Sequence, residues 1–253
     1  MATEQTEAIV LRLIEFSETS LIATLYSRDL GRISAIAKGA RRPKSPFDGA
    51  LDLLAVCRIV VICKSSDALD LLTEAKLQRR FRAASRSLLR LNCGYYVAEV
   101  LRLWTDSGAT ASHPLYDLTL RTIAAIDGTE DPLFAVLRFE LTGLRILGHA
   151  PATRDCVGCG TRVDTAAARI PFAYHMGGVL CPACRPRQRE VASIRREVLQ
   201  ACTRLQDATG GPVEGVGENL YRDLRAVVSR CVCTHLGAVP RTQSLLPTKW
   251  VSH

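Results

Sequence analysis

Residues 32–38 read RISAIAK, and apolar and polar side chains alternate along this stretch. In an extended chain one face would carry Ile33, Ala35 and Ala37, and the other would carry Arg32, Ser34, Ile36 and Lys38. Alternation with a period of two is typical of a β-strand that buries one of its faces. The preceding residues 28–31, RDLG, form a turn signal. We therefore expect this strand to form a hairpin with the apolar run before it.

Four further short runs in the first eighty residues also show a mostly period-two pattern. The five expected strands cover residues 7–16, 20–27, 32–38, 50–64 and 69–77. Five short strands in so short a stretch favour a closed barrel, because closure removes exposed sheet edges. An oligonucleotide-binding (OB) barrel fits this strand count. A phosphate backbone would then be expected to meet the barrel at the third strand and the loop after it.

From Gln78 onward the pattern becomes helical. One buried helix face is expected from apolar residues spaced three and four apart, namely Phe81, Ala84, Leu88, Leu91, Tyr95 and Ala98. Further helices are expected over residues 114–126, 132–147, 193–207 and 218–236, and Asp131 is the predicted cap of the second of these. The sequence thus predicts an α+β multidomain protein, with an OB-fold barrel over residues 1–78 and an α-helical domain over residues 79–253.

Two CxxC pairs interrupt the helical region. They are Cys156 with Cys159 and Cys181 with Cys184, separated by twenty-one residues. Two such pairs can supply the four thiolates of a tetrahedral zinc site. We therefore expect one structural Zn²⁺ in an inserted zinc knuckle over residues 152–190. A redox pair is the main alternative, and His175 is close enough in sequence to replace one thiolate.

The third expected strand runs into a strongly basic loop. Arg32, Lys38, Arg41, Arg42 and Lys44 place five positive charges in thirteen positions, and the next carboxylate is Asp48. Basic loops beside a barrel can bind a phosphate chain without reading bases, so these residues are predicted to bind DNA. The expected barrel has only three aromatic residues for base stacking, which are Phe16, Tyr26 and Phe47. Backbone electrostatics should therefore outweigh stacking.

A second basic stretch follows the last expected strand. Residues 76–90 hold six basic side chains and no acid. On a continuous helix, an arc of about 80° would carry Arg79, Arg82, Arg86 and Arg90. This stripe either faces a ligand or is a solvated helix face. We favour the ligand-facing interpretation.

The composition narrows the function classes. The 253 residues carry a net charge of +8, which favours a polyanionic partner. The sequence has no run of eighteen apolar residues and no signal-peptide pattern, so a cytoplasmic, nucleoid-associated protein is expected. It also has no phosphate-binding loop, HExxH or GxSxG motif. Neither catalysis nor a small-molecule substrate is expected.

Four segments together carry a resemblance to a known family. They are VLRLIEFSETSLIATLYSRDLGRISAIAKGARRPKS, RFELTGLRILGHAPATRDCVGCG, FAYHMGGVLCPAC and HLGAVPRTQSLL, in this order. With these segments the chain resembles the bacterial recombination mediator RecO family nearly from end to end. The resemblance implies an OB-fold, a zinc knuckle in a helical domain, binding to single- and double-stranded DNA, and annealing of complementary strands. Because annealing needs two strands held at once, the arginine stripe is then predicted to bind DNA as a second surface for a second strand. The resemblance also implies RecR and the single-strand binding protein SSB as partners in loading RecA. The alternative is a zinc-ribbon protein adaptor or transcription-associated factor without annealing activity.

Overall fold

The structure is a computed structural model, which describes residues 2–47, 49–64, 68–106, 110–164, 167–207 and 218–248. The chain folds into two compact units, Met1–Thr129 and Glu130–His253. In the described parts of the chain, no helix is long and apolar enough to cross a membrane.

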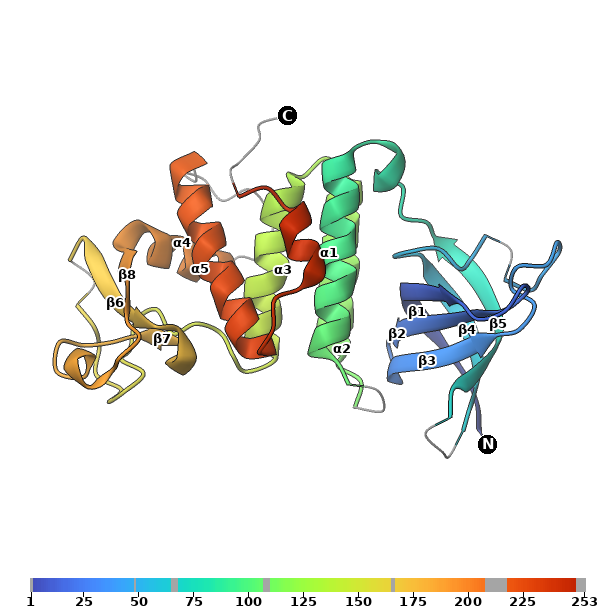
Figure 1. Ribbon diagram of the computed structural model, residues 1–253, viewed down its shortest axis with the longest axis horizontal. Helices are drawn as coiled ribbons and strands as arrows, with labels where there is room; N and C mark the ends of the chain where they lie inside the picture. The colour runs from blue at the N-terminus through green and yellow to red at the C-terminus, as the bar shows by residue number, and fades with distance from the viewer. Residues whose placement is uncertain are drawn as a thin grey trace. The chain divides into compact units, whose positions relative to one another are not determined.

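The first unit begins with a closed five-stranded barrel (Figure 1). Its strands are β1 (Ala2–Glu15), β2 (Leu21–Ser27), β3 (Gly31–Ala37), β4 (Val56–Cys63) and β5 (Asp70–Arg79). They pair in the order β1-β2-β3-β5-β4, and β4 returns to β1 to close the barrel. β3 and β5 run parallel, and the other pairs are antiparallel. The predicted five-stranded OB-type barrel is confirmed.

The interior of the barrel follows the alternation seen in the sequence. Along β3, Ile33, Ala35 and Ala37 are buried, and the residues between them are half-buried. Larger side chains such as Leu25 and Ile59 fill the centre, and small alanines from several strands pack among them. Small and large residues that alternate on the inner face allow five short strands to close around a filled core.

The fourth strand is shorter than the sequence pattern indicated. β4 starts at Val56, and residues 50–55 form turns that cover the barrel. Leu54 has a φ of +57°, which no strand residue adopts, and its N–H donates to the Val10 carbonyl at 2.8 Å. Leu54 is nevertheless fully buried. The apolar run therefore reflects core packing and not a longer strand.

The helix expected from Gln78 also differs. β5 continues to Arg79, a short 3₁₀ helix η1 (Ala83–Ser85) follows, and α1 (Leu88–Trp104) begins only after the extended residue Ser87. The predicted buried face is wrong in part, because Leu88 is 72% exposed and Tyr95 is 42% exposed. Because the chain is extended at Ser87, the residues of α1 that face the core differ from those expected for one continuous helix. The core face of α1 is instead formed by Cys93, Tyr96, Val97, Val100, Leu101 and Trp104.

Helix α2 (His113–Asp127) completes the first unit. The Ser112 hydroxyl caps its start by accepting from the Leu115 N–H at 3.4 Å. Tyr116 on α2 donates to the Glu7 carboxylate on β1 at 2.9 Å, and α1 also contacts β1. This packing makes residues 1–129 one compact unit. The domain boundary predicted after Gln78 rests on the change from a strand-like to a helix-like sequence pattern. It stays a prediction.

In the second unit the helices α3 (Pro132–Ile146), α4 (Arg196–Asp207) and α5 (Glu218–Leu236) lie side by side (Figure 1). The predicted cap is confirmed, because Asp131 accepts from the Leu133 N–H at 2.8 Å. Fully buried Glu140 on α3 pairs with Arg225 on α5. The start of the helix expected at residue 193 is corrected, because β8 takes residues 192–195.

A small sheet accompanies the cysteine pairs between α3 and α4. Its strands pair in the order β7-β6-β8 and cover β6 (Arg169–Ala173), β7 (Gly178–Val179) and β8 (Ala192–Arg195). The remaining 3₁₀ helices are η2 (Tyr174–Met176), η3 (Arg185–Arg187) and η4 (Arg241–Leu245).

Candidate metal centre and nucleic-acid interface

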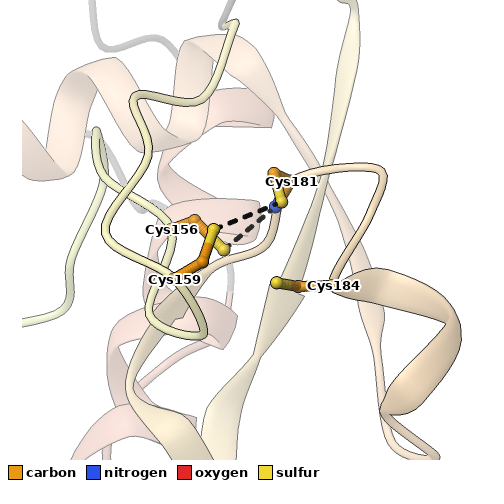
Figure 2. Close-up of side chains that lie close together, drawn as sticks. All are labelled: Cys156, Cys159, Cys181 and Cys184. Atoms are coloured by element: carbon orange, nitrogen blue, oxygen red, sulfur yellow. Dashed lines mark hydrogen bonds between the residues drawn. The ribbon is translucent and has the colours of Figure 1, made fainter.

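The four cysteines of the two CxxC pairs come together in the second unit. Their Sγ atoms all lie within 4.8 Å of one another, and those of Cys159 and Cys181 are 3.7 Å apart (Figure 2). Four sulfurs around a tetrahedral zinc ion at about 2.3 Å would be about 3.8 Å apart. The geometry and the soft thiolate donors therefore fit a single zinc ion.

Backbone hydrogen bonds shape the first cysteine pair into a tight turn. The Cys156 N–H donates to the Thr161 carbonyl at 2.9 Å, and the Gly160 N–H donates to the Cys156 carbonyl at 2.8 Å. The Cys156 sulfur accepts from the N–H groups of Cys181 at 3.3 Å and Gly158 at 3.4 Å. Burial opposes ionisation of this thiol, but the N–H donors outweigh it and lower the pKa of Cys156 to about 6. The turn thus favours a thiolate.

Two glycines allow the two cysteine pairs to approach each other. A Cβ on Gly158 would lie 3.1 Å from the Cys184 sulfur. A Cβ on Gly178 would lie 2.5 Å from Cγ1 of Val157 and 2.7 Å from Cβ of Ala152. A side chain would therefore overlap its neighbours at Gly178 and would be tightly packed at Gly158. The segment is therefore packed around the cysteine cluster.

His175 is not a member of the cysteine group. Its side chain is exposed, and its ring hydrogen-bonds the Gln188 side chain at 3.2 Å. The group that could hold a metal ion consists of the four cysteines, as the spacing predicted.

The basic loop after β3 is exposed but well anchored. Lys38, Arg41, Arg42 and Lys44 are all exposed. The Arg41 N–H donates to the Thr19 carbonyl at 3.0 Å, which ties the loop to the β1–β2 turn. The loop therefore presents its charges from a defined position at one end of the barrel.

One of these charges has a partner that the local sequence did not indicate. Arg41 lies 3.1 Å from the Glu15 carboxylate, and both side chains are solvent-exposed. An exposed pair of this kind is weak and can exchange its carboxylate for a phosphate. The pair with Glu15 lowers the net positive charge of the basic loop, which nevertheless remains positive.

The aromatic residues of the barrel are mostly unavailable for stacking. Tyr26 and Phe47 are buried in the core, at 2% and 3% exposure, so Phe47 does not project from the basic loop as its sequence position suggested. Phe16 in the β1–β2 turn is 59% exposed. Of the three candidates, Phe16 has the accessible ring.

Arg32 differs from the other predicted loop residues. Its side chain is half-buried and donates to the Arg102 carbonyl in the last turn of α1 at 2.8 Å. A guanidinium at this position complements the negative end of the helix dipole. The charge of Arg32 therefore stabilises the fold of the first unit.

The predicted arginine stripe does not lie on one helix. Arg79 ends β5, Arg82 and Arg86 flank η1, and Arg90 is in the first turn of α1. Their contacts meet instead on α2, and three of the four reach its last turn. There Arg79, Arg86 and Arg90 donate to the carbonyls of Leu120, Asp127 and Ile126, at 3.3, 2.7 and 2.6 Å, and the Arg82 N–H donates to the Asp127 carboxylate at 2.9 Å. We call these four residues the α2 clamp.

The α2 clamp corrects the expectation that these arginines share one helix face, and DNA binding by them stays a prediction. A helix C-terminus carries a partial negative charge and unpaired carbonyls, and the guanidinium groups of Arg86 and Arg90 satisfy both. Arg79, Arg82 and Arg86 also line a groove of about 570 Å³ together with Arg80, which the helical spacing had passed over. The basic stretch over residues 76–90 was the sequence signal by which Arg80 could have been included in the predicted basic surface.

The fold and the cysteine cluster define an α+β class in which an OB-type barrel is followed by helices with an inserted four-cysteine segment. A family model described as recombination protein O N terminal matches residues 1–81, and one described as recombination protein O C terminal matches residues 85–244. The chain belongs to the recombination protein O (RecO) family of DNA repair proteins.

Individual relatives are similar over nearly the whole chain. A DNA repair protein RecO of Rhodopirellula baltica is 43% identical over 96% of this chain and 98% of its own. That of Symbiobacterium thermophilum is 28% identical over 98% and 96%, and that of Anaeromyxobacter dehalogenans is 30% identical over 90% of both chains.

Proposed function

We propose that the protein is a DNA-binding recombination mediator that binds single- and double-stranded DNA and anneals complementary strands. The observation that carries this proposal is the exposed basic loop of Lys38, Arg41, Arg42 and Lys44, anchored at one end of an OB-type barrel. Family membership agrees with it, since the relatives are named DNA repair proteins. With RecR, and at DNA covered by SSB, the protein would help to load RecA.

The loop can hold DNA by electrostatics. Each lysine or arginine that neutralises a phosphate releases a counterion, and this gain depends little on the base sequence. The one accessible ring near the loop, Phe16, would stack on a base of any kind. The proposed activity makes and breaks no covalent bond, so the proposal includes no catalytic step.

We infer further that the cysteine cluster holds one Zn²⁺ through Cys156, Cys159, Cys181 and Cys184. The ion would supply a cross-link between the two cysteine pairs. Four thiolates complete a tetrahedral coordination sphere, so the inferred role is structural. Its contribution would be to fold and fix residues 152–190.

The test is an annealing assay with two complementary oligonucleotides and no nucleotide cofactor. We expect the protein to accelerate annealing, and Arg41→Ala with Arg42→Ala to slow it. A matched control is Arg12→Ala with Arg58→Ala, which removes two exposed arginines from strands of the same barrel. Equal loss in both variants would move the binding surface away from the loop. Absence of annealing by the unaltered protein would favour a protein adaptor instead.

A further inference from the structure

The second unit contains a basic pocket that no sequence pattern indicated. It has a volume of about 230 Å³, and its charged lining consists of Arg154, Arg162, Arg196 and Arg204. Thr153, Gln200 and Thr203 add polar groups, and none of the described residues that line the pocket carries a carboxylate. We call it the four-arginine pocket. Its members were missed because they lie up to fifty residues apart.

The pocket is built from two segments that are held together. Arg154 and Arg162 flank the first cysteine pair, and the Val163 N–H donates to the Arg154 carbonyl at 2.9 Å. Arg196, Gln200 and Arg204 follow one another at intervals of four along α4 and share a face of that helix. The hydroxyls of Thr153 and Thr203 are 2.8 Å apart and join the two segments.

The charge of the pocket is only partly balanced. Arg162 lies 3.6 Å from Asp155, and Arg196 lies 3.6 Å from Glu197. Within the described parts of the chain, Arg154 and Arg204 form no ion pair. Exposed ion pairs are weak, so an anion with a higher charge density can replace these carboxylates. The pocket therefore keeps an excess of positive charge along a lining that includes four arginines.

We propose that the four-arginine pocket binds phosphate groups of a second DNA strand. The inference rests on the proposed annealing function, which needs two strands held at once. Planar guanidinium groups match phosphate oxygens in bidentate pairs, and threonine hydroxyls and a glutamine amide add donors. Arg196 and Arg204 are eight residues apart, which is about 12 Å along a helix. This span suits consecutive phosphates of a backbone better than one free phosphate.

The pocket also resolves a difficulty that the α2 clamp creates. Three of the four arginines expected to hold the second strand donate to helix carbonyls in the first unit. The four-arginine pocket lies in the other compact unit, so each unit would carry its own phosphate-binding surface.

The test counts strands bound per chain by native mass spectrometry. The probe is an oligothymidylate of about 8 nucleotides, which is within the site size of one OB barrel. Because it has no complementary partner, the count does not depend on annealing. We expect two strands per chain for the unaltered protein. We expect one for Arg154→Gln with Arg204→Gln, and one for the fourfold alanine variant of Lys38, Arg41, Arg42 and Lys44.

The matched control is Arg145→Gln with Arg187→Gln, which removes two exposed arginines of the same unit outside the pocket and should leave two strands bound. At low salt, where residual second-strand binding can be titrated, the pocket variant should flatten the salt slope of that binding by about 1.4 units, at roughly −0.7 per phosphate contact. As a second variant, Arg154→Lys with Arg204→Lys keeps the charge and should weaken second-strand binding less.

The remaining outcomes separate the alternatives. One strand per chain for the unaltered protein, or two for the pocket variant, would overturn the proposal. Displacement of the second strand by millimolar inorganic phosphate would assign the pocket to a small phosphate ligand and also overturn it. If two strands bind but complementary strands do not anneal, the pocket assignment stands and the annealing function fails.

Discussion

At the scale of single residues, the packing of Gly178 gives a direct test of the cysteine segment. A methyl group there would overlap Val157 and Ala152, so we expect Gly178→Ala to cost about 1–3 kcal/mol of stability. Thermal unfolding and zinc content would both report the loss. Combining the change with Val157→Ala removes one of the overlaps and should restore part of the stability. Unchanged stability in the single variant would contradict the packing described here.

The neighbouring rings of His149 and His235 predict a pH dependence of stability. Their centroids are 4.1 Å apart, and burial, followed by the charge of His149, lowers the pKa of His235 below the ordinary value of 6.5. As the pH falls below about 6.5, the unfolded chain takes up a proton that the folded chain resists, so stability should decrease. His235→Gln should show a smaller decrease in melting temperature between pH 6.5 and 5.5. Exposed His175→Gln is the control and should behave like the unaltered protein.

At the scale of elements, the α2 clamp predicts a structural role for Arg90. Its guanidinium is half-buried and donates to the Ile126 carbonyl at 2.6 Å. Arg90→Ala should therefore destabilise the first unit by about 1–2 kcal/mol, because a charged donor at the helix end is lost. Affinity for one DNA strand should remain within about twofold of the unaltered value, since the proposed DNA binding depends on the loop. Denaturant unfolding and a binding titration would check both expectations. Stability that is unaffected, with a large loss of affinity, would return Arg90 to the DNA-binding surface.

The cysteine segment predicts how metal and folding are linked. Cys181→Ser should release zinc and lower the melting temperature of the second unit, because metal binding supplies part of the folding free energy in such sites. Cys202→Ser is a suitable control, as this buried cysteine lies on α4 outside the cysteine group. Zinc content by atomic absorption and thermal unfolding are the measurements. Loss of zinc without loss of stability would rule out the scaffold role.

At the scale of the whole molecule, the sequence predicted the features that depend on local patterns. Alternation located β3, and cysteine spacing identified the four-cysteine cluster, because both are short-range signals. It mispredicted the start of the helix after Gln78, because apolar residues and arginines spaced three and four apart also fit a strand end, a 3₁₀ turn and a later helix start. It could not predict the four-arginine pocket or the pairing of Arg41 with Glu15, since only the folded chain brings those residues together.

The central claim is that the basic loop carries DNA binding through phosphate contacts, and its most direct test is the salt dependence of affinity for single-stranded DNA. The slope of log K against log salt should be roughly −0.7 per phosphate contacted. Replacing Lys38, Arg41, Arg42 and Lys44 by alanine should flatten it by about two to three units, with little change in sequence preference. A slope that is the same in both proteins would contradict the claim and place the binding surface elsewhere.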